Sequence, residues 1–462
     1  MTLFSPQIAQ SLLDQALSLG ADFADIFVER QQRQQISCLN QQVESVQQGI
    51  DFGIGIRLLF GTQVVYGYSN NLQQQSLSQL VAELAKRYQN RDPRQAQPLA
   101  WQMHPQQHPS QRTLLQDPAV DEKVQFLLAA DRQAKLGERI STTKSWSLQR
   151  QQWVEIFNSQ GLHCADERNY LRVGLTAICQ QDGQQFSGSE NFGGQIGWEL
   201  AGQHSASGLG EEAKRQALIN ASAKPCPSGR MPVVIGNGFG GVIFHEACGH
   251  LLETTSVAKK ASVFHDKLGQ TIAHPCVNAV DSGLESNAWG SLTLDDEGMP
   301  TQRTQLIKDG QLAGFLVDYV GSLQTGYART GSGRRESYRF APASRMRNTY
   351  IEPGQDSFDD MIASIDKGIF AARMGGGSVQ PGTGEFNFAV TEGYYVENGK
   401  IQHPVKACTL ISTGPEVLKE ISMVGDDLAL ACGMCGSVSG SIPASVGQPS
   451  LKVNSIVVGG NA

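Results

Sequence analysis

The sequence predicts an α+β fold, in which a helix-flanked sheet region is followed by a larger, β-rich and barrel-like C-terminal domain. Helical and strand patterns alternate over the first half of the chain, whereas short strand patterns dominate from about residue 225 onward. The 50 glycines exceed ordinary usage and favour many tight turns. A chain of 462 residues is also too long for one ordinary core, so we expect two or three domains.

The N-terminal segment begins with a helix signal. Ser5 and Pro6 are typical of an N-cap and a first helical residue, and apolar residues then recur on one face as far as Gly20. We next expect a strand at 25–30 and a helix at about 72–88. Between them, strands over 43–68 are expected to be broken by four glycines, with a hairpin turn at the last: Gly49, Gly53, Gly55 and Gly61.

A segment rich in proline and glutamine follows at 91–113, and we interpret it as an exposed connector. His104 and His108 have the four-residue spacing of a metal-binding pair on a helix. Pro105 and Pro109 make a helix improbable there, so we do not expect these histidines to bind metal.

The next part of the chain alternates again between helix and strand signals. We expect helices at about 120–136 and 208–222, strands that include 153–157 and 171–179, and a hairpin turn at Asp182-Gly183. The predicted organisation is an N-terminal α/β subdomain, the connector, a second α+β subdomain and a β-rich C-terminal domain, with these bounds: 1–90, 91–113, 114–224 and 225–462.

Composition excludes several classes of protein. The net charge of −7 and the pI of about 5.8 argue against a general nucleic-acid binder, which would carry a basic face. No signal peptide and no run of 18 apolar residues is visible, so we expect no membrane association. Nine scattered cysteines, an odd and low count for this length, suit a reducing compartment and predict the cytoplasm.

One segment carries a motif with clear chemistry. His245-Glu246 is followed by His250, which gives the pattern H-E-x-x-x-H. Residues five apart on a regular helix differ by about 140° of rotation, so the two histidines would not face one ion. The spacing therefore predicts a helix that is bulged, by a π-turn, or broken. Gly249 is a plausible place for this distortion, since glycine accepts unusual dihedral angles.

With that geometry the motif predicts a zinc site. His245 and His250 would bind the ion through neutral imidazoles, and Glu246 would act as general base on the attacking water. A catalytic zinc needs a third protein ligand. Glu253 could supply it or could instead hold His250 by a hydrogen bond, which we favour. The alternative interpretation of the motif is a helix with two surface histidines and a solvated glutamate.

The chain resembles the TldD/PmbA family of metallopeptidases, and its metal-binding TldD-type branch in particular. The resemblance extends over most of the chain and is most specific in the central and C-terminal blocks. These blocks are Gly249-His250-Leu251-Leu252-Glu253, Val257 to Phe264, Arg345-Met346-Arg347-Asn348-Thr349-Tyr350-Ile351, Gly375-Gly376-Gly377, Pro381-Gly382-Thr383-Gly384-Glu385-Phe386, Gly433-Met434-Cys435-Gly436 and Val446 to Val453.

This resemblance implies a function and the missing ligand. It implies a zinc-dependent peptidase for peptides or unfolded proteins, with Cys435 as third ligand and Cys432 as its main rival. Family members form homodimers, or heterodimers with a related subunit that lacks the motif. The resemblance also suggests that peptide substrate runs as an added strand near Gly375, Gly376 and Gly377, although these glycines could instead form a tight bend between barrel strands.

Two other functions remain open at this stage. The chain could be a non-catalytic peptide-binding or maturation factor with a structural zinc, which a fourth ligand such as Cys432 would favour. It could also be a thiol enzyme that uses Cys435 or Cys248 as nucleophile beside a histidine.

Overall fold

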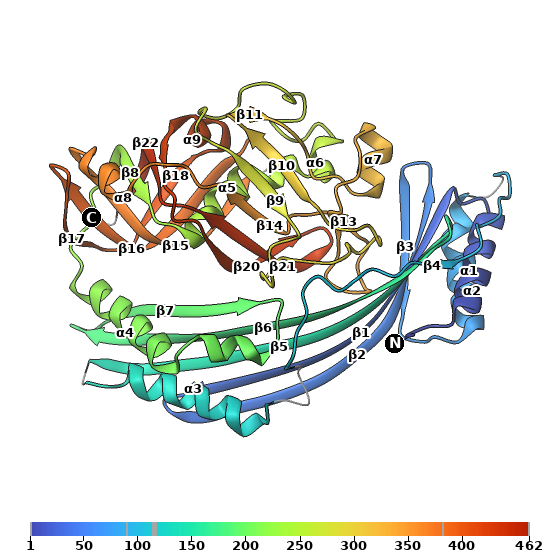
Figure 1. Cartoon of the computed structure of the whole chain (residues 1–462), viewed down its shortest axis with the longest axis horizontal. Helices are drawn as coiled ribbons and strands as arrows, with labels where there is room; N and C mark the ends of the chain where they lie inside the picture. Colours follow the sequence, from blue (N-terminus) through green and yellow to red (C-terminus); the bar gives the residue numbers. More distant parts are fainter. Residues whose placement is uncertain (1, 89–90, 113–117, 138, 381–382, 461–462) are drawn as a thin grey trace.

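A long, curved sheet runs through the first half of the chain (Figure 1). The computed structural model describes residues 2–88, 91–112, 118–137, 139–380 and 383–460; the predicted boundary at 113/114 and the pair Pro381-Gly382 lie outside them. The strand order is β3-β2-β1-β5-β6-β4, with β7 also paired to β6. The strands are β1 (Phe23–Leu39), β2 (Gln42–Phe60), β3 (Gln63–Ser69), β4 (Ala100–Trp101), β5 (Ile140–Asn158), β6 (Leu162–Gln181) and β7 (Gln184–Gly194).

This one sheet crosses the predicted division of the N-terminal half. Strands β1 to β3 come from the predicted subdomain 1–90, and β5 to β7 come from 114–224. The two groups are joined because β1 pairs antiparallel with β5, from Asp25 opposite Asn158 to Leu39 opposite Lys144. The division into subdomains stays a prediction. Its parts 1–90 and 114–224 nevertheless contribute strands to the same hydrogen-bonded sheet.

Helices cover the two ends of the sheet (Figure 1). At one end lie α1 (Pro6–Ser18) and α2 (Gln74–Ala85), which a 3₁₀ turn extends over Lys86–Tyr88. At the other end lie α3 (Val120–Ala134) and α4 (Ala206–Ser222), with a 3₁₀ helix η2 (Trp198–Gln203) before α4. Ser5 caps α1 as predicted, since its side chain accepts a hydrogen bond from the backbone N–H of Ile8.

The expectation that glycines break the strands over 43–68 is wrong except at Gly61. Strand β2 runs unbroken through Gly49, Gly53 and Gly55, and only Gly61 lies in a turn, with φ +63°. Close packing explains two of these glycines. A Cβ at Gly53 would lie 2.2 Å from the Tyr338 ring, and one at Gly55 would lie 1.8 Å from the Tyr66 hydroxyl. These positions admit a neighbouring tyrosine and do not end a strand.

Most described residues of the 91–113 connector are exposed, as the sequence predicts, but the segment also makes specific contacts. Strand β4 pairs with β6 through Ala100 and Trp101, and His108 is buried, with its Nε2 3.1 Å from the carbonyl of Gly283. The segment therefore packs between the long sheet and the C-terminal half. Prolines prevent helix here, but they do not prevent burial.

The C-terminal half contains a closed five-stranded barrel, in the order β15-β8-β22-β18-β16 with β16 paired back to β15. Strand β17 pairs with β16 and β19 with β22. The strands are β8 (Gly229–Ile235), β15 (Lys367–Gln380), β16 (Glu385–Glu397), β17 (Lys400–Val405), β18 (Cys408–Thr413), β19 (Ile421–Val424) and β22 (Leu451–Gly459).

A six-stranded sheet lies beside the barrel, in the order β11-β10-β9-β14-β21-β20. Its strands are β9 (Ala279–Ser282), β10 (Arg303–Lys308), β11 (Gln311–Leu312), β14 (Asn348–Ile351), β20 (Ala429–Ser437) and β21 (Gly440–Gln448), and β12 (Gly333–Arg334) pairs separately with β13 (Ala343–Ser344). The remaining helices are η3 (Gly238–Gly241), α5 (Val242–Ala247), η4 (Gly249–Leu252), α6 (Thr254–Val257), α7 (Tyr319–Thr325), α8 (Phe358–Ala363) and α9 (Gly414–Glu420).

One large apolar core joins α5 to both the barrel and the six-stranded sheet. Phe244 of α5 is almost fully buried in it, together with Phe388 of the barrel and Ile442 of β21. Burial of such side chains stabilises each by about 1.5–3 kcal/mol relative to exposure. The helix that carries the motif is therefore held on two sides.

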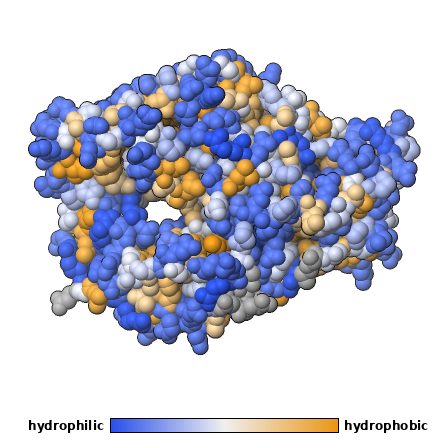
Figure 2. Space-filling view, viewed as in Figure 1, coloured by the Kyte–Doolittle hydropathy of each residue, from blue (hydrophilic) through white to orange (hydrophobic). Residues whose placement is uncertain are grey.

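The long sheet and the C-terminal half meet through a small apolar cluster, in which Phe27 and Leu294 take part, and through polar contacts. Arg373 of β15 forms ion pairs with Glu190 of β7 and Glu212 of α4, and Arg215 of α4 pairs with Glu392 of β16. Figure 2 shows an opening through the molecule between these two layers. No helix among the described residues is both long and apolar enough to cross a membrane.

Candidate metal centre

The motif helix is interrupted, as the five-residue spacing predicts. Helix α5 ends at Ala247, Cys248 has φ −130° and ψ −52°, and the chain then continues as the 3₁₀ helix η4. The interruption is thus a break followed by a tighter helix, and it falls one residue before Gly249. Glycine at 249 serves packing, because a Cβ there would lie 2.1 Å from the sulfur of Met346.

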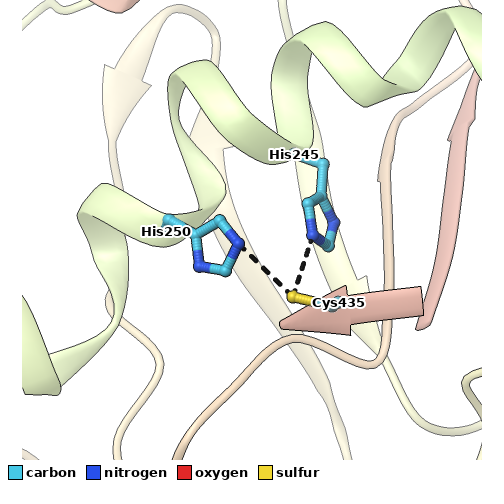
Figure 3. Close-up of side chains that lie close together, drawn as sticks. All are labelled: His245, His250 and Cys435. Atoms are coloured by element: carbon cyan, nitrogen blue, oxygen red, sulfur yellow. Dashed lines mark hydrogen bonds between the residues drawn. The ribbon is translucent and has the colours of Figure 1, made fainter. Parts of the chain in front are cut away.

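The break brings three potential ligands together (Figure 3). Nε2 of His245 and Nε2 of His250 each lie 3.3 Å from Sγ of Cys435, and the three ligand atoms lie within 4.8 Å of one another. His245 and Cys435 are only 3% and 4% exposed. The two imidazole rings are nearly perpendicular, at 87°, and approach the sulfur from two successive helical segments.

Cys435 and its rival Cys432 occupy different surroundings. Both lie on β20, and residues three apart on a strand point to opposite faces. Cys432 does not belong to the group of ligand atoms, and burial raises the pKa of its thiol to about 12. Cys248 is also fully buried outside the group, and burial raises its pKa. Among the described residues, Cys435 is therefore the cysteine that can join the two histidines.

Charge favours the thiolate at Cys435. Burial alone would raise the pKa of this thiol, but the charges and hydrogen bonds of His245 and His250 outweigh burial and hold it well below its usual value. For His250, burial would lower the pKa, whereas Glu253 and the Cys435 thiolate raise it well above its usual value. The thiolate is the form of cysteine that binds metal, whereas the raised pKa of His250 favours a protonated imidazole, which must lose its proton when metal binds.

Two glutamates flank His250 in different ways. Glu253 is nearly buried, and its Oε2 lies 3.2 Å from Nδ1 of His250. An N–H donated from Nδ1 to this carboxylate fixes the orientation of the ring and keeps Nε2 directed toward Cys435. The side chain of Glu246 is 23% exposed, and its Oε2 lies 3.6 Å from Nε2 of His250. Glu246 is thus beside the ligand atoms but open to water, whereas Glu253 lies behind a ligand.

Other histidines of the described residues, and the glycine run of β15, lie outside this cluster. His265 and His274 contact Ser262 and Cys276, and neither belongs to the ligand group, nor do His104 and His108. Gly375, Gly376 and Gly377 lie in β15, where its register with β16 shifts. A Cβ at Gly377 would lie 2.0 Å from the carbonyl oxygen of Asn387, so close strand approach requires that glycine. A role for these glycines in substrate binding stays a prediction.

Three side chains that hold β20 were missed as functional residues. Trp289 Nε1 donates to the carbonyl of Gly433 at 2.7 Å, Arg172 donates to that of Cys432 at 3.1 Å, and Arg345 donates to that of Cys435. All three are distant in sequence from β20. No local pattern marks them, although Arg345 lies in a block that carries the family resemblance.

The chain matches three successive domain descriptions of one protein family. Residues 24–87 match the PmbA/TldA metallopeptidase domain 1, residues 114–221 the central domain, and residues 228–460 the C-terminal domain. A Metalloprotease TldD homolog of Haemophilus influenzae is 37% identical, with 99% of this chain and 96% of that protein covered. The chain belongs to the PmbA/TldD metallopeptidase family.

Solved structures share the fold of this chain. A Thermotoga maritima protein described as a proposed modulator of a DNA gyrase superposes with a TM-score of 0.80 at 20% identity, covering 98% of this chain and 99% of its own. TldE from Thermococcus kodakarensis gives a TM-score of 0.77 at 16% identity, covering 98% and 100%. The predicted α+β class with a barrel-like C-terminal domain is confirmed.

Membership of a metallopeptidase family implies a metal ion, and the residues present fit one. Two imidazoles and a thiolate form a donor set of the kind that zinc accepts. Nδ1 of His250 is held by a carboxylate, as is usual for a ligating histidine. Nδ1 of His245 has no hydrogen-bond partner among the described residues.

Proposed function

We propose that this protein is a zinc-dependent peptidase that hydrolyses peptides or unfolded proteins. One observation carries the proposal: His245, His250 and Cys435 converge within 4.8 Å, and the carboxylate of Glu246 lies beside them, open to solvent. His245, His250 and Cys435 would hold the ion. A catalytic zinc has three protein ligands, and no fourth histidine, cysteine or carboxylate of the described residues joins this group.

The chain's own residues supply the proton transfers. A zinc ion held by these residues would supply Lewis acidity and lower the pKa of the attacking water. Glu246 accepts the proton of the attacking water and passes it to the leaving amine. Glu253 keeps His250 in one orientation through Nδ1. The buried surroundings of His245 and Cys435 strengthen these electrostatic interactions.

A structural zinc in a non-catalytic binding or maturation factor is the second candidate. Such sites are usually closed by four ligands. Cys432 is the natural fourth ligand, but it lies outside the group and its backbone carbonyl is bonded to Arg172. A partly exposed glutamate beside a set of three ligands supports catalysis over this alternative.

Substrate access and assembly complete the proposal. Figure 1 places β15 and β16 on the side of the C-terminal half that faces the long sheet, where Figure 2 shows the opening. A peptide that entered there in an extended form could lie along the strand that contains Gly375, Gly376 and Gly377.

We further propose a cytoplasmic protein that acts as a homodimer or as a heterodimer with a related subunit that lacks the motif.

Removal and return of the metal tests the proposal. A chelator should abolish hydrolysis of an unstructured peptide such as casein fragments, and addition of zinc should restore it. Alkylation of the metal-free protein at Cys435 should block this recovery, because the thiolate is a ligand. A protein that hydrolyses peptides equally well with and without chelator would be a thiol enzyme or another non-metal peptidase, and the proposal would be wrong.

A further inference from the structure

We infer that Arg345 positions the metal centre by tying the strand that carries Cys435 to the glutamate that holds His250. This inference rests on the proposed function, because it assigns a role to a residue behind the same ligands. The ligands come from segments 185 residues apart in sequence, so some contact must set the distance between them. Arg345 lies between the two segments and is completely buried.

On one side, Arg345 holds the β20–β21 hairpin. Its NH2 group donates to the backbone carbonyl of Cys435 itself. Its NH1 group donates to the hydroxyl of Ser439 at 3.0 Å and to the carbonyl of Gly440 at 2.9 Å. Three acceptors on the ligand strand and the following turn are thus bonded to one guanidinium.

On the other side, Arg345 faces the carboxylate of Glu253. Its Nε lies 3.9 Å from Oε1 of Glu253, and neither atom has a hydrogen-bond partner among the described residues. The other oxygen of this carboxylate is 3.2 Å from Nδ1 of His250. Arg345 and Glu253 are both buried, so water does not solvate their charges. Each charge is instead compensated by the opposite charge of the other side chain.

These contacts explain why an arginine suits the position. A guanidinium keeps its charge and presents five N–H donors in a rigid plane, so it can bond several acceptors in fixed directions. A lysine would retain the charge toward Glu253 but could not hold the same three acceptors of the hairpin. We therefore expect Arg345→Lys to weaken zinc binding, because the distance between the Cys435 thiolate and the His250 imidazole is no longer fixed.

Arg347 provides a matched control. It is equally buried and two residues away, but its guanidinium bonds Asp281, Thr330 and Gly331 and does not contact the metal cluster. A loss that arises from general destabilisation should appear in Arg347→Lys as well. A loss that arises from positioning of the ligands should appear in Arg345→Lys only.

The experiment measures the zinc Kd of the full chain by competition with a chromophoric chelator, alongside the thermal unfolding midpoint. Residues that orient ligands typically contribute 10–100-fold to metal affinity, so Arg345→Lys and Glu253→Gln should each raise the Kd by roughly that factor. The double variant should raise it by less than the product of the two single effects, because both act on the same arrangement. Arg347→Lys should leave the Kd unchanged.

Ser439→Ala keeps the test decisive if Arg345→Lys does not fold. This variant removes one acceptor of Arg345 and little else, and it should raise the zinc Kd by a smaller factor. Equal Kd values in wild type, Arg345→Lys and Arg347→Lys would overturn the inference, as would unchanged values in both Ser439→Ala and Glu253→Gln. A wild type that binds no zinc would instead refute the proposed function.

Discussion

Glu246→Gln is expected to lower kcat for peptide hydrolysis by roughly 10²–10⁴-fold, the usual contribution of a general base. Glutamine keeps the shape of the side chain but cannot accept a proton. Glu246 lies beside Nε2 of His250 without joining the three ligand atoms, so zinc content should stay at the wild-type value. Both quantities can be measured on one preparation, by steady-state kinetics and by elemental analysis.

Glu253→Gln is the informative comparison, because the two glutamates flank the same histidine. Glu253→Gln weakens the hydrogen bond to Nδ1 of His250 and so lowers the affinity for zinc. Activity should therefore fall at low zinc and recover in excess zinc. The change at 246 should not respond to added zinc. Peptide hydrolysis at the wild-type rate in Glu246→Gln would remove this residue from the mechanism.

Arg57→Met is expected to reduce the free energy of unfolding by about 3–5 kcal/mol, the cost of leaving buried charges without their partner. Arg57 is fully buried in β2 and pairs with Asp25 of β1 and, at 2.8 Å, with Glu297 of the C-terminal half. Burial would lower the pKa of Arg57, but these two carboxylates raise it, so the group stays charged. The variant leaves Asp25 without its cation and leaves Glu297 with Arg329 alone, at the contact between the two halves.

Arg339→Met is the matched control for this second prediction. Arg339 also pairs with an acid of the long sheet, Asp51, but the two side chains are 43% and 37% exposed. Exposed pairs contribute only about 0–1 kcal/mol. The midpoint of urea unfolding should therefore be clearly lower for Arg57→Met than for Arg339→Met. A midpoint for Arg57→Met as high as that for Arg339→Met would show that the buried pair does not join the halves.

Local signals could be interpreted correctly from the sequence because their causes are local. The cap at Ser5 and the turn at Asp182-Gly183, where both residues have positive φ, depend on a few neighbouring atoms. The five-residue spacing of His245 and His250 likewise required a departure from a regular helix. A π-bulge and a break satisfy that spacing equally, so the spacing alone does not distinguish them.

Features set by distant contacts could not be predicted in the same way. The strand expected at 25–30 extends to Leu39 through a glutamine-rich stretch, because pairing with β2 and β5 on both sides supplies its hydrogen bonds. Gly53 and Gly55 resemble strand breaks in the sequence, because the tyrosines that fill the space beside them are not local neighbours. Cys435 was proposed as a ligand through the family resemblance, since no local pattern links it to a helix 185 residues earlier.

The zinc content of purified wild type, measured beside that of Cys435→Ala, tests the central claim most directly. We expect about one zinc per chain in the wild type and a sharp reduction in the variant, because the thiolate is one of three ligands. Both proteins should first be shown to fold, by their thermal unfolding transitions. Full zinc in both proteins would contradict the assignment of Cys435, and a wild type that binds no zinc when supplied with it would contradict the metal centre itself.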